Sequence, residues 1–146
     1  MRTAVGFVEP DLIAPGIEIV EEHETDLPNV QVDPIQTEQV ILNLVRNAID
    51  ADRADSDRGK RLQIRATTRL QAPSTVTVSV RDNGRGVDPD RVEFLFDEFY
   101  TTKEHGLGLG LSISRSIVES YGGALWLEST SPSGTTFCFS LPAAPQ

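Results

Sequence analysis

Residues 80–123, VRDNGRGVDPDRVEFLFDEFYTTKEHGLGLGLSISRSIVESYGG, contain two glycine motifs around which the rest of the chain is organised. In the first motif, Gly84 and Gly86 flank Arg85 directly after a run of alternating valines. The second motif alternates glycine with leucine: Gly106, Leu107, Gly108, Leu109, Gly110 and Leu111. Glycine lets backbone N–H groups approach a ligand closely, so such loops commonly wrap an anion. A flexible linker is the alternative for the second motif, but the intervening leucines are untypical of a solvated linker.

A helix is expected directly after the second glycine motif. Ile113, Ile117, Val118 and Tyr121 fall on one stripe at helical spacing, and Ser112 stands near the start. The N-terminus of a helix offers unpaired N–H donors and the positive end of its dipole, which suits phosphate. A Walker loop is excluded, because no glycine here is followed by its Lys-Ser or Lys-Thr pair. A dinucleotide fingerprint is excluded, because Ile113 stands where its third glycine should be.

Composition indicates one soluble domain with an ordinary core. The chain has 146 residues, with 13 basic against 22 acidic side chains, so its net charge of −9 disfavours a nucleic-acid partner. Cys138 is the only cysteine, which excludes an intrachain disulfide and a multi-thiolate zinc site. The sequence has no signal-peptide core and no apolar run of membrane-spanning length. We therefore expect this chain to be cytoplasmic and without direct membrane contact, in a full-length protein that is either soluble or membrane-anchored.

Asp33 and Pro34 predict the start of a helix that extends to about Ala51, with Gln36 placed as in a capping box. At 100° per residue one arc of this helix is apolar, and it carries Ile41, Leu44, Val45, Ala48 and Ile49. The amide and carboxylate residues Asn43, Asn47 and Asp50 lie on the opposite side. They form either a solvated face or a site for a hard cation or phosphate, since oxygen ligands suit Mg²⁺.

Alternating apolar residues predict strands on both sides of these helices. The expected strands cover residues 17–20, 30–32, 62–66, 76–80, 124–128 and 135–141, with the first pair and the last pair forming hairpins. Their order with the helices predicts an α/β (α+β) two-layer sandwich: a mixed, mostly antiparallel sheet with helices on one face. The expected organisation is an N-terminal segment over 1–15, one domain over 16–142 and a tail over 143–146.

Four ordered blocks resemble a known family. They are QVILNLVRNAIDA from Gln39, DNGRGV from Asp82, FDEFYTTK from Phe96 and GLGLGLSIS from Gly106. These blocks resemble the N, G1, F and G2 boxes of the ATP-binding catalytic domain of sensor histidine kinases, closest to the nitrogen- and oxygen-sensing branch. These kinases belong to the wider gyrase, chaperone, histidine-kinase and mismatch-repair ATPase superfamily. The resemblance implies a Bergerat-type ATP-binding fold with ATP between the helices and a mobile lid over its phosphates.

The resemblance also implies roles for single residues. Asp82 matches the carboxylate that accepts a hydrogen bond from the adenine amino group, and an ordinary Asx turn is the alternative. Asn47 matches the residue that holds Mg²⁺, and Asn43 matches its neighbour that faces the phosphates; both are the implied catalytic residues. Lys103 matches a position that reaches the phosphates, or is simply exposed. The further residues implied in nucleotide binding are Asp50, Gly84, Gly86, Val87, Phe99, Thr102, Gly106, Leu107, Gly108, Leu109, Gly110 and Leu111.

The residue at position 43 also bears on the phosphoryl acceptor. Relatives that hydrolyse ATP or phosphorylate serine carry a glutamate base where this chain has Asn43, whereas a neutral imidazole is nucleophilic without such a base. The resemblance therefore implies a histidine acceptor, on a separate helical dimerisation domain, that passes the group to a response regulator. His23 only echoes the acceptor motif, because Thr25 and Asp26 break it.

Two alternatives remain open. One is a regulatory module that holds nucleotide and signals by protein docking. The other is an ATPase or serine kinase of the superfamily, which Asn43 disfavours. The isolated chain is expected to be monomeric.

Overall fold

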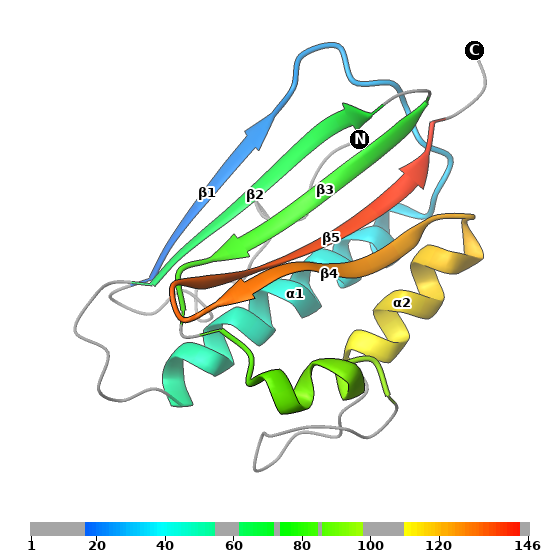
Figure 1. The fold of residues 1–146 in the computed structure, drawn as a ribbon. Coiled ribbons are helices and arrows are strands. Elements are labelled where there is room, and N and C mark those ends of the chain that lie inside the picture. Colours follow the sequence, from blue (N-terminus) through cyan, green and yellow to red (C-terminus); the bar gives the residue numbers. More distant parts are fainter. Residues whose placement is uncertain (1–16, 55–61, 72–73, 85, 98–109, 144–146) are drawn as a thin grey trace.

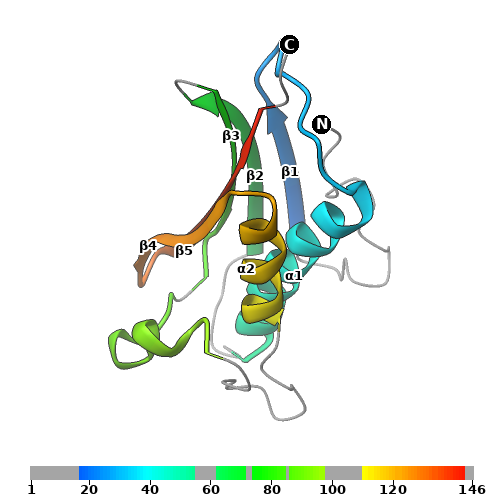
Figure 2. The ribbon, with the colours of Figure 1, turned by 90° about the vertical axis from the view of Figure 1, so that its right-hand side faces the viewer.

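One mixed sheet and two α-helices form two layers (Figures 1 and 2). The structure, a computed structural model, describes residues 17–54, 62–71, 74–84, 86–97 and 110–143. In chain order its elements are β1 (Ile17–His23), α1 (Pro34–Ala54), β2 (Leu62–Gln71), β3 (Thr75–Asp82), the 3₁₀ helix η3 (Pro89–Phe94), α2 (Gly110–Ser120), β4 (Ala124–Ser131) and β5 (Gly134–Pro142). The strands lie in the order β1-β2-β3-β5-β4, and Figure 2 shows α1 and α2 together on one face. This arrangement confirms the predicted two-layer sandwich.

The predicted hairpin at the start of the chain is wrong. β1 pairs with β2 in parallel, from Ile17 opposite Leu62 to His23 opposite Thr68. Parallel neighbours need a long crossover connection, and here that connection contains α1. The segment at 30–32 is therefore not a strand but part of the crossover, and its valines pack against the core.

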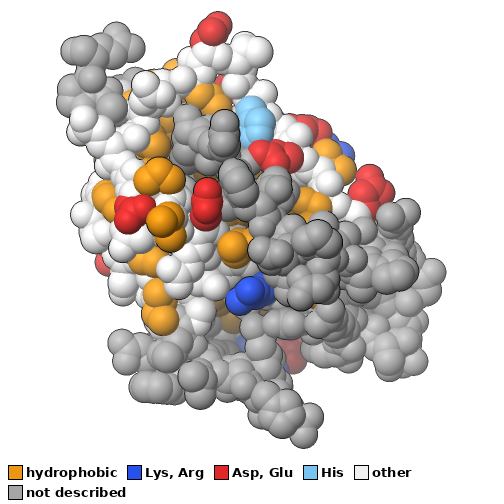
Figure 3. All heavy atoms as spheres, turned by 180° about the vertical axis from the view of Figure 1, so that it is seen from behind, with side chains coloured by type: hydrophobic (Ala, Val, Ile, Leu, Met, Phe, Trp, Pro, Cys, Tyr) orange, Lys and Arg blue, Asp and Glu red, His pale blue; other side chains and the backbone are white. Residues whose placement is uncertain are grey.

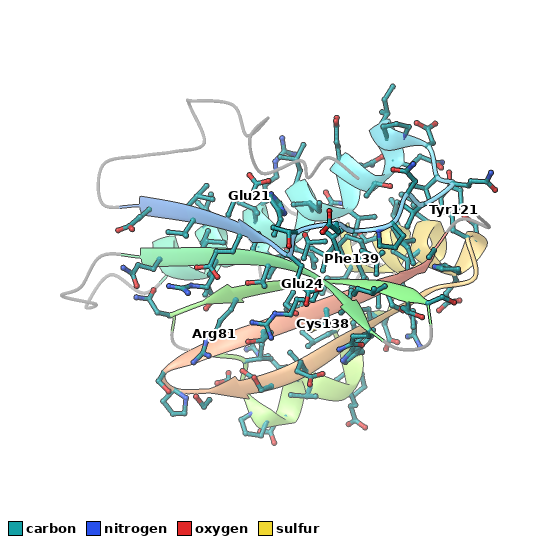
Figure 4. The ribbon with its side chains drawn as sticks, turned by 90° about the horizontal axis from the view of Figure 1, so that it is seen from above. Glu21, Glu24, Arg81, Tyr121, Cys138 and Phe139 are labelled. Carbon is teal, nitrogen blue, oxygen red and sulfur yellow. The ribbon has the colours of Figure 1, made fainter. Side chains whose placement is uncertain are left out.

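The other strand pairings are antiparallel, and the pairing of β4 with β5 confirms the predicted hairpin at the end of the chain. β3 lies between β2 and β5, so its last residue, Asp82, leaves the sheet at the centre rather than at an edge. Side chains alternate between the two faces of β5: Phe139 points toward the helices and Cys138 away from them (Figure 4). Burial raises the pKa of the Cys138 thiol, and the contact with Ser79 Oγ at 3.2 Å lowers it less. Cys138 is thus a small strand side chain, as predicted.

The start of α1 is capped as the sequence predicts, but Gln36 acts differently. Asp33 Oδ1 accepts the Ile35 backbone N–H at 2.9 Å, which satisfies one unpaired donor of the first turn. Gln36 Oε1 accepts instead from the Tyr121 hydroxyl, and the Tyr121 oxygen accepts from the Asp33 backbone N–H at 3.0 Å. The start of α1 is therefore tied to the turn after α2 (Figure 4), and α1 continues to Ala54.

The core lies between the helices and the sheet. The predicted apolar arc of α1 is fully buried, and it comprises Ile41, Leu44, Val45, Ala48 and Ile49, with Val40 added. The helix-facing side chains of the sheet complete the cluster, including Ile64, Val78, Val80, Phe137 and Phe139. Burial of each such side chain contributes about 1.5–3 kcal/mol, so this interface holds the two layers together.

The predicted stripe of α2 is only partly confirmed. Val118 is buried, and Ile117 and Tyr121 pack partly against the core. Ile113 is 40% exposed, while the neighbouring Ser114 is 0% exposed. The helix is thus rotated so that a hydroxyl faces α1 in place of an isoleucine.

The surface on the helix side is mixed. Figure 3 shows hydrophobic side chains there interspersed with acidic and uncharged ones. Among the described residues, the large hydrophobic side chains that are exposed come from different elements: Ile35, Leu70, Phe94 and Ile113. No helix in the described part of the chain is long and apolar enough to cross a membrane.

Candidate functional site

The site asparagines lie on α1, beside the buried apolar arc. Asn43 and Asn47 are both half-buried, and they are one helical turn apart. The Asn43 amide nitrogen donates to Ser114 Oγ at 3.0 Å and to the Gly110 carbonyl oxygen at 3.4 Å. The helix that carries Asn43 is thus in direct contact with the start of α2. Asp50 belongs to α1, but its side chain lies outside the described part of the structure.

Asp82 stands at the end of the central strand β3, where its carboxylate is held by the loop that follows. Its Oδ1 accepts the backbone N–H of Gly84 at 2.8 Å, which is the Asx turn considered as an alternative. A carboxylate can accept several hydrogen bonds, so this turn is compatible with a ligand donor at the same group. Asn83 clamps the loop to β2, because its Oδ1 accepts the Gln63 N–H at 2.8 Å. Asp82 is therefore a carboxylate of fixed orientation at the end of the central strand β3.

The loop after Asp82 packs on the turn between β4 and β5. Gly86 has a φ of +85°, and a Cβ there would lie 2.2 Å from the Ser131 carbonyl oxygen. The Val87 N–H donates to Thr130 Oγ1 at 2.8 Å, and Thr130 Oγ1 is 3.0 Å from Thr135 Oγ1. The first glycine motif is thus shaped by the last hairpin of the chain.

The supporting residues on that hairpin were not predicted from the sequence. They are Thr130, Thr135 and Gly134, and a Cβ on Gly134 would meet the Asp82 carbonyl oxygen at 2.2 Å. Thr135 is buried opposite Asp82, although it is polar. In the sequence the only signal is a threonine, Thr135, that follows the turn glycine Gly134. The strand partner of Thr135 is Asp82, 53 positions earlier in the chain, and only the strand register identifies it.

The described part of the second glycine motif is the start of α2. Gly110 is the first residue of the helix, and a Cβ on it would meet nothing within 4 Å. Leu111 packs against the core. The predicted site residues Phe99, Thr102, Lys103, Gly106, Leu107, Gly108 and Leu109 lie outside the described residues.

One aromatic residue of the third block is placed. Phe96 packs partly against the core and meets the Phe137 ring edge-on at a centroid distance of 6.3 Å. The Arg115 guanidinium lies 5.0 Å from the centre of the Phe96 ring, and Arg115 Nε pairs with Glu119 at 2.9 Å. The segment after η3 is therefore held between β5 and α2.

The charged and metal-ligating groups of the site are few. Within the described ranges no group of three or more His, Cys, Asp and Glu side chains is placed to hold a metal ion. The candidates are the amide oxygens of Asn43 and Asn47, and neutral oxygen ligands are compatible with Mg²⁺ when phosphate oxygens complete its coordination. His23 pairs with Glu21 on the edge strand β1, which confirms that this histidine does not sit on a long helix.

These elements meet at one end of the molecule. In Figure 1 the loop after β3, η3 and the start of α2 all lie at the lower end of the two layers. The loop that begins at Asp82 and the start of α2, which contacts Asn43, therefore lie at the same end of the molecule. A carboxylate and a helix N-terminus of this kind can bind a ligand that has both a donor group and an anionic group.

Comparison with known proteins identifies a family and several relatives. The family described as histidine kinase-, DNA gyrase B-, and HSP90-like ATPase matches residues 32–145. The chain is 44% identical over 115 residues to the sensor protein FixL of Bradyrhizobium diazoefficiens, covering 79% of the chain and 22% of FixL. It is 46% identical over 110 residues to the C4-dicarboxylate transport sensor protein DctB of Rhizobium meliloti, covering 75% of the chain and 17% of DctB. The chain therefore spans about a fifth of the length of these relatives.

Solved structures are also similar. The catalytic domain of histidine kinase ThkA is 35% identical, with a TM-score of 0.72, and the match covers 88% of this chain and 80% of that domain. Full-length ShkA in complex with AMPPNP is 30% identical, with a TM-score of 0.75, over 90% of this chain and 26% of ShkA. The fold is therefore that of catalytic domains from histidine kinases.

Proposed function

Because the chain belongs to the histidine kinase-, DNA gyrase B-, and HSP90-like ATPase family, we propose that it is the ATP-binding catalytic domain of a two-component sensor histidine kinase. The observation that supports this proposal is that Asp82 and Asn43 are each held in a fixed orientation. The first is a carboxylate fixed by the Gly84 N–H, and the second is an amide fixed against the start of α2. The similarity to ShkA, whose structure holds AMPPNP, supports an adenine nucleotide as the ligand.

Asp82 selects the base in this proposal. Its carboxylate accepts a hydrogen bond from the exocyclic amino group of adenine, while Gly84 and Gly86 let the backbone approach the ring. Guanine has a carbonyl oxygen at the same position, so two acceptors would face each other and the carboxylate would gain no hydrogen bond from the base. That arrangement costs about 1–3 kcal/mol, so ATP is preferred over GTP.

Asn43 and Asn47 serve the phosphate end. Both offer amide oxygens from one side of α1, and the first backbone N–H groups of α2, at Gly110 and Leu111, are donors toward an anion. Mg²⁺ held by Asn47 would neutralise charge on the phosphate oxygens. The role of the protein is then to fix the triphosphate in line with its acceptor, since phosphoryl transfer depends mainly on positioning and charge neutralisation.

The acceptor is a histidine on a separate helical dimerisation domain, which passes the phosphoryl group to a response-regulator aspartate. An imidazole needs no base at pH 7, which agrees with an amide rather than a carboxylate at position 43. In this proposal residues 16–142 form the catalytic unit, which acts in the cytoplasm and is monomeric when isolated.

Calorimetry with ATP and GTP, with and without Mg²⁺, tests the proposal. The wild type is expected to bind ATP. Asp82→Asn is expected to lower the affinity for ATP by about 10- to 100-fold, because the charge-assisted hydrogen bond is lost. Asn47→Ala is expected to leave Mg²⁺-free binding unchanged and to remove the gain in affinity that Mg²⁺ gives. Equal affinity for GTP, or ATP binding by Asp82→Asn equal to that of the wild type, would refute the base assignment.

Failure of the folded wild type to bind any adenine nucleotide would favour the regulatory module that signals by protein docking. Phosphotransfer to a purified histidine-kinase dimerisation domain then tests the acceptor. Transfer to serine, or ATP hydrolysis without transfer, would contradict the histidine assignment.

A further inference from the structure

Ser114 is a fully buried polar residue of α2. It is 0% exposed on the face of α2 that meets α1, while Ile113 beside it is 40% exposed. Burying a hydroxyl without a hydrogen bond costs about 1–3 kcal/mol, so the orientation of α2 depends on a partner for this group. That partner is the amide nitrogen of Asn43, at 3.0 Å.

The second contact of Asn43 fixes which way its amide points. A hydroxyl can accept or donate, so Ser114 alone is compatible with either end of the amide. The Gly110 carbonyl can only accept, and it lies 3.4 Å from the same nitrogen. The NH₂ group must therefore face α2, and the carbonyl oxygen of Asn43 lies on the other side of the amide, away from Ser114 and Gly110.

We propose that Ser114 is a positioning residue. Together with the Gly110 carbonyl it holds the NH₂ group of Asn43 against α2, so that Asn43 offers only its oxygen to the metal–triphosphate end of the ligand. This inference rests on the proposed function and deepens it. An oxygen suits a hard cation or its bound water, whereas an NH₂ group pointing outward would oppose one.

The same contact links the two helices that frame the site. Asn43 lies in the middle of α1, and both of its partners belong to the first turns of α2. A ligand that binds the Asn43 oxygen therefore also stabilises the position of the α2 start. The orientation of the Asn43 amide and the position of the α2 N-terminus are therefore coupled.

Side-chain amide NMR on the ¹⁵N-labelled chain without nucleotide tests the positioning directly. Ser114→Ala is expected to shift the Asn43 NH₂ resonances and to speed their exchange with water. Ser116→Ala, an exposed serine on the same helix, is the matched control and should leave them unchanged. Unchanged Asn43 resonances in Ser114→Ala would overturn the proposal.

A double-mutant cycle tests the consequence for binding. Ser114→Ala is expected to lower the affinity for Mg²⁺–ATP about 3- to 10-fold and to lower the affinity for ATP without Mg²⁺ by less. In the Asn43→Ala background the same substitution should have no further effect, and Ser114→Thr, which keeps the hydroxyl, should recover much of the affinity. An equal loss in both backgrounds would mean that Ser114 acts only through general packing. Absence of ATP binding by the wild type would refute the proposed function, whereas the NMR result would still decide the orientation of Asn43.

Discussion

The two glycine motifs have similar sequences but different structural reasons for their glycines. Gly86 has a positive φ of +85°, and a Cβ on it would lie 2.2 Å from the Ser131 carbonyl oxygen. Gly110 has no such constraint, because a Cβ on it would meet nothing within 4 Å. Among the described residues, the Ser131 backbone thus gives a packing reason for a glycine at position 86, and no atom gives one at position 110.

This difference distinguishes a glycine that close packing requires, Gly86, from a glycine that the proposed function assigns to ligand binding, Gly110. Gly110 begins α2, and its carbonyl oxygen lies 3.4 Å from the Asn43 amide nitrogen. Because no described atom lies within 4 Å of a Cβ at Gly110, a glycine here is compatible with the approach of an anion to the helix N-terminus, as the proposed function requires. The space beside Gly86 is filled by the backbone of the last hairpin, so this glycine acts on the ligand only through the loop that it shapes.

The largest effect is expected from Gly86→Ala. The added methyl group meets a backbone carbonyl in a left-handed conformation, so we expect the free energy of unfolding to fall by about 3 kcal/mol or more. Urea denaturation measures it. The matched control is Gly122→Ala. Gly122 has a φ of +82°, but the nearest atom to an added Cβ is the Pro142 Cγ at 3.6 Å, so the free energy of unfolding should fall by only about 1 kcal/mol. Equal losses in the two variants would show that the contact with Ser131 has no cost.

Gly110→Ala should give the opposite pattern. Alanine favours the helix over glycine, so the free energy of unfolding is expected to stay unchanged or rise by up to about 1 kcal/mol. The affinity for ATP is expected to fall about tenfold, which corresponds to about 1.4 kcal/mol, because the methyl group occupies space that the phosphates use. Calorimetry and thermal unfolding of the same sample check both halves. Wild-type affinity would contradict a ligand-directed role for this glycine.

A smaller effect is expected from Thr130→Val, which keeps the shape but removes the acceptor for the Val87 N–H. The expected loss of stability is about 1 kcal/mol, since a partly buried donor loses its partner. Thr130→Ser keeps the hydroxyl and is the control. If the valine variant is as stable as wild type while the serine variant is not, the methyl group rather than the hydrogen bond supports the loop.

Local pattern was sufficient for much of the fold. The apolar arc of α1, its Asp33 cap and the antiparallel hairpin at the end of the chain follow from spacing and turn residues, and the structure confirms them. The first strand was mispaired, because adjacent strands in the sequence usually form hairpins and the parallel partner of β1 comes only after α1. The Asp82 loop was identified from its glycines, but its support on Thr130 was not, since that contact joins distant parts of the chain.

The sequence by itself determined the family, the helix that carries Asn43 and Asn47, and the loop that carries Asp82, because these depend on residues close together in the chain. Tertiary structure alone decided which glycine packs against backbone and which faces open space. It also decided that Ser114 rather than Ile113 faces α1. Helical periodicity gives the relative angles of residues on a helix, but the rotation of that helix against its neighbour is set by packing and by the hydrogen bond to Asn43.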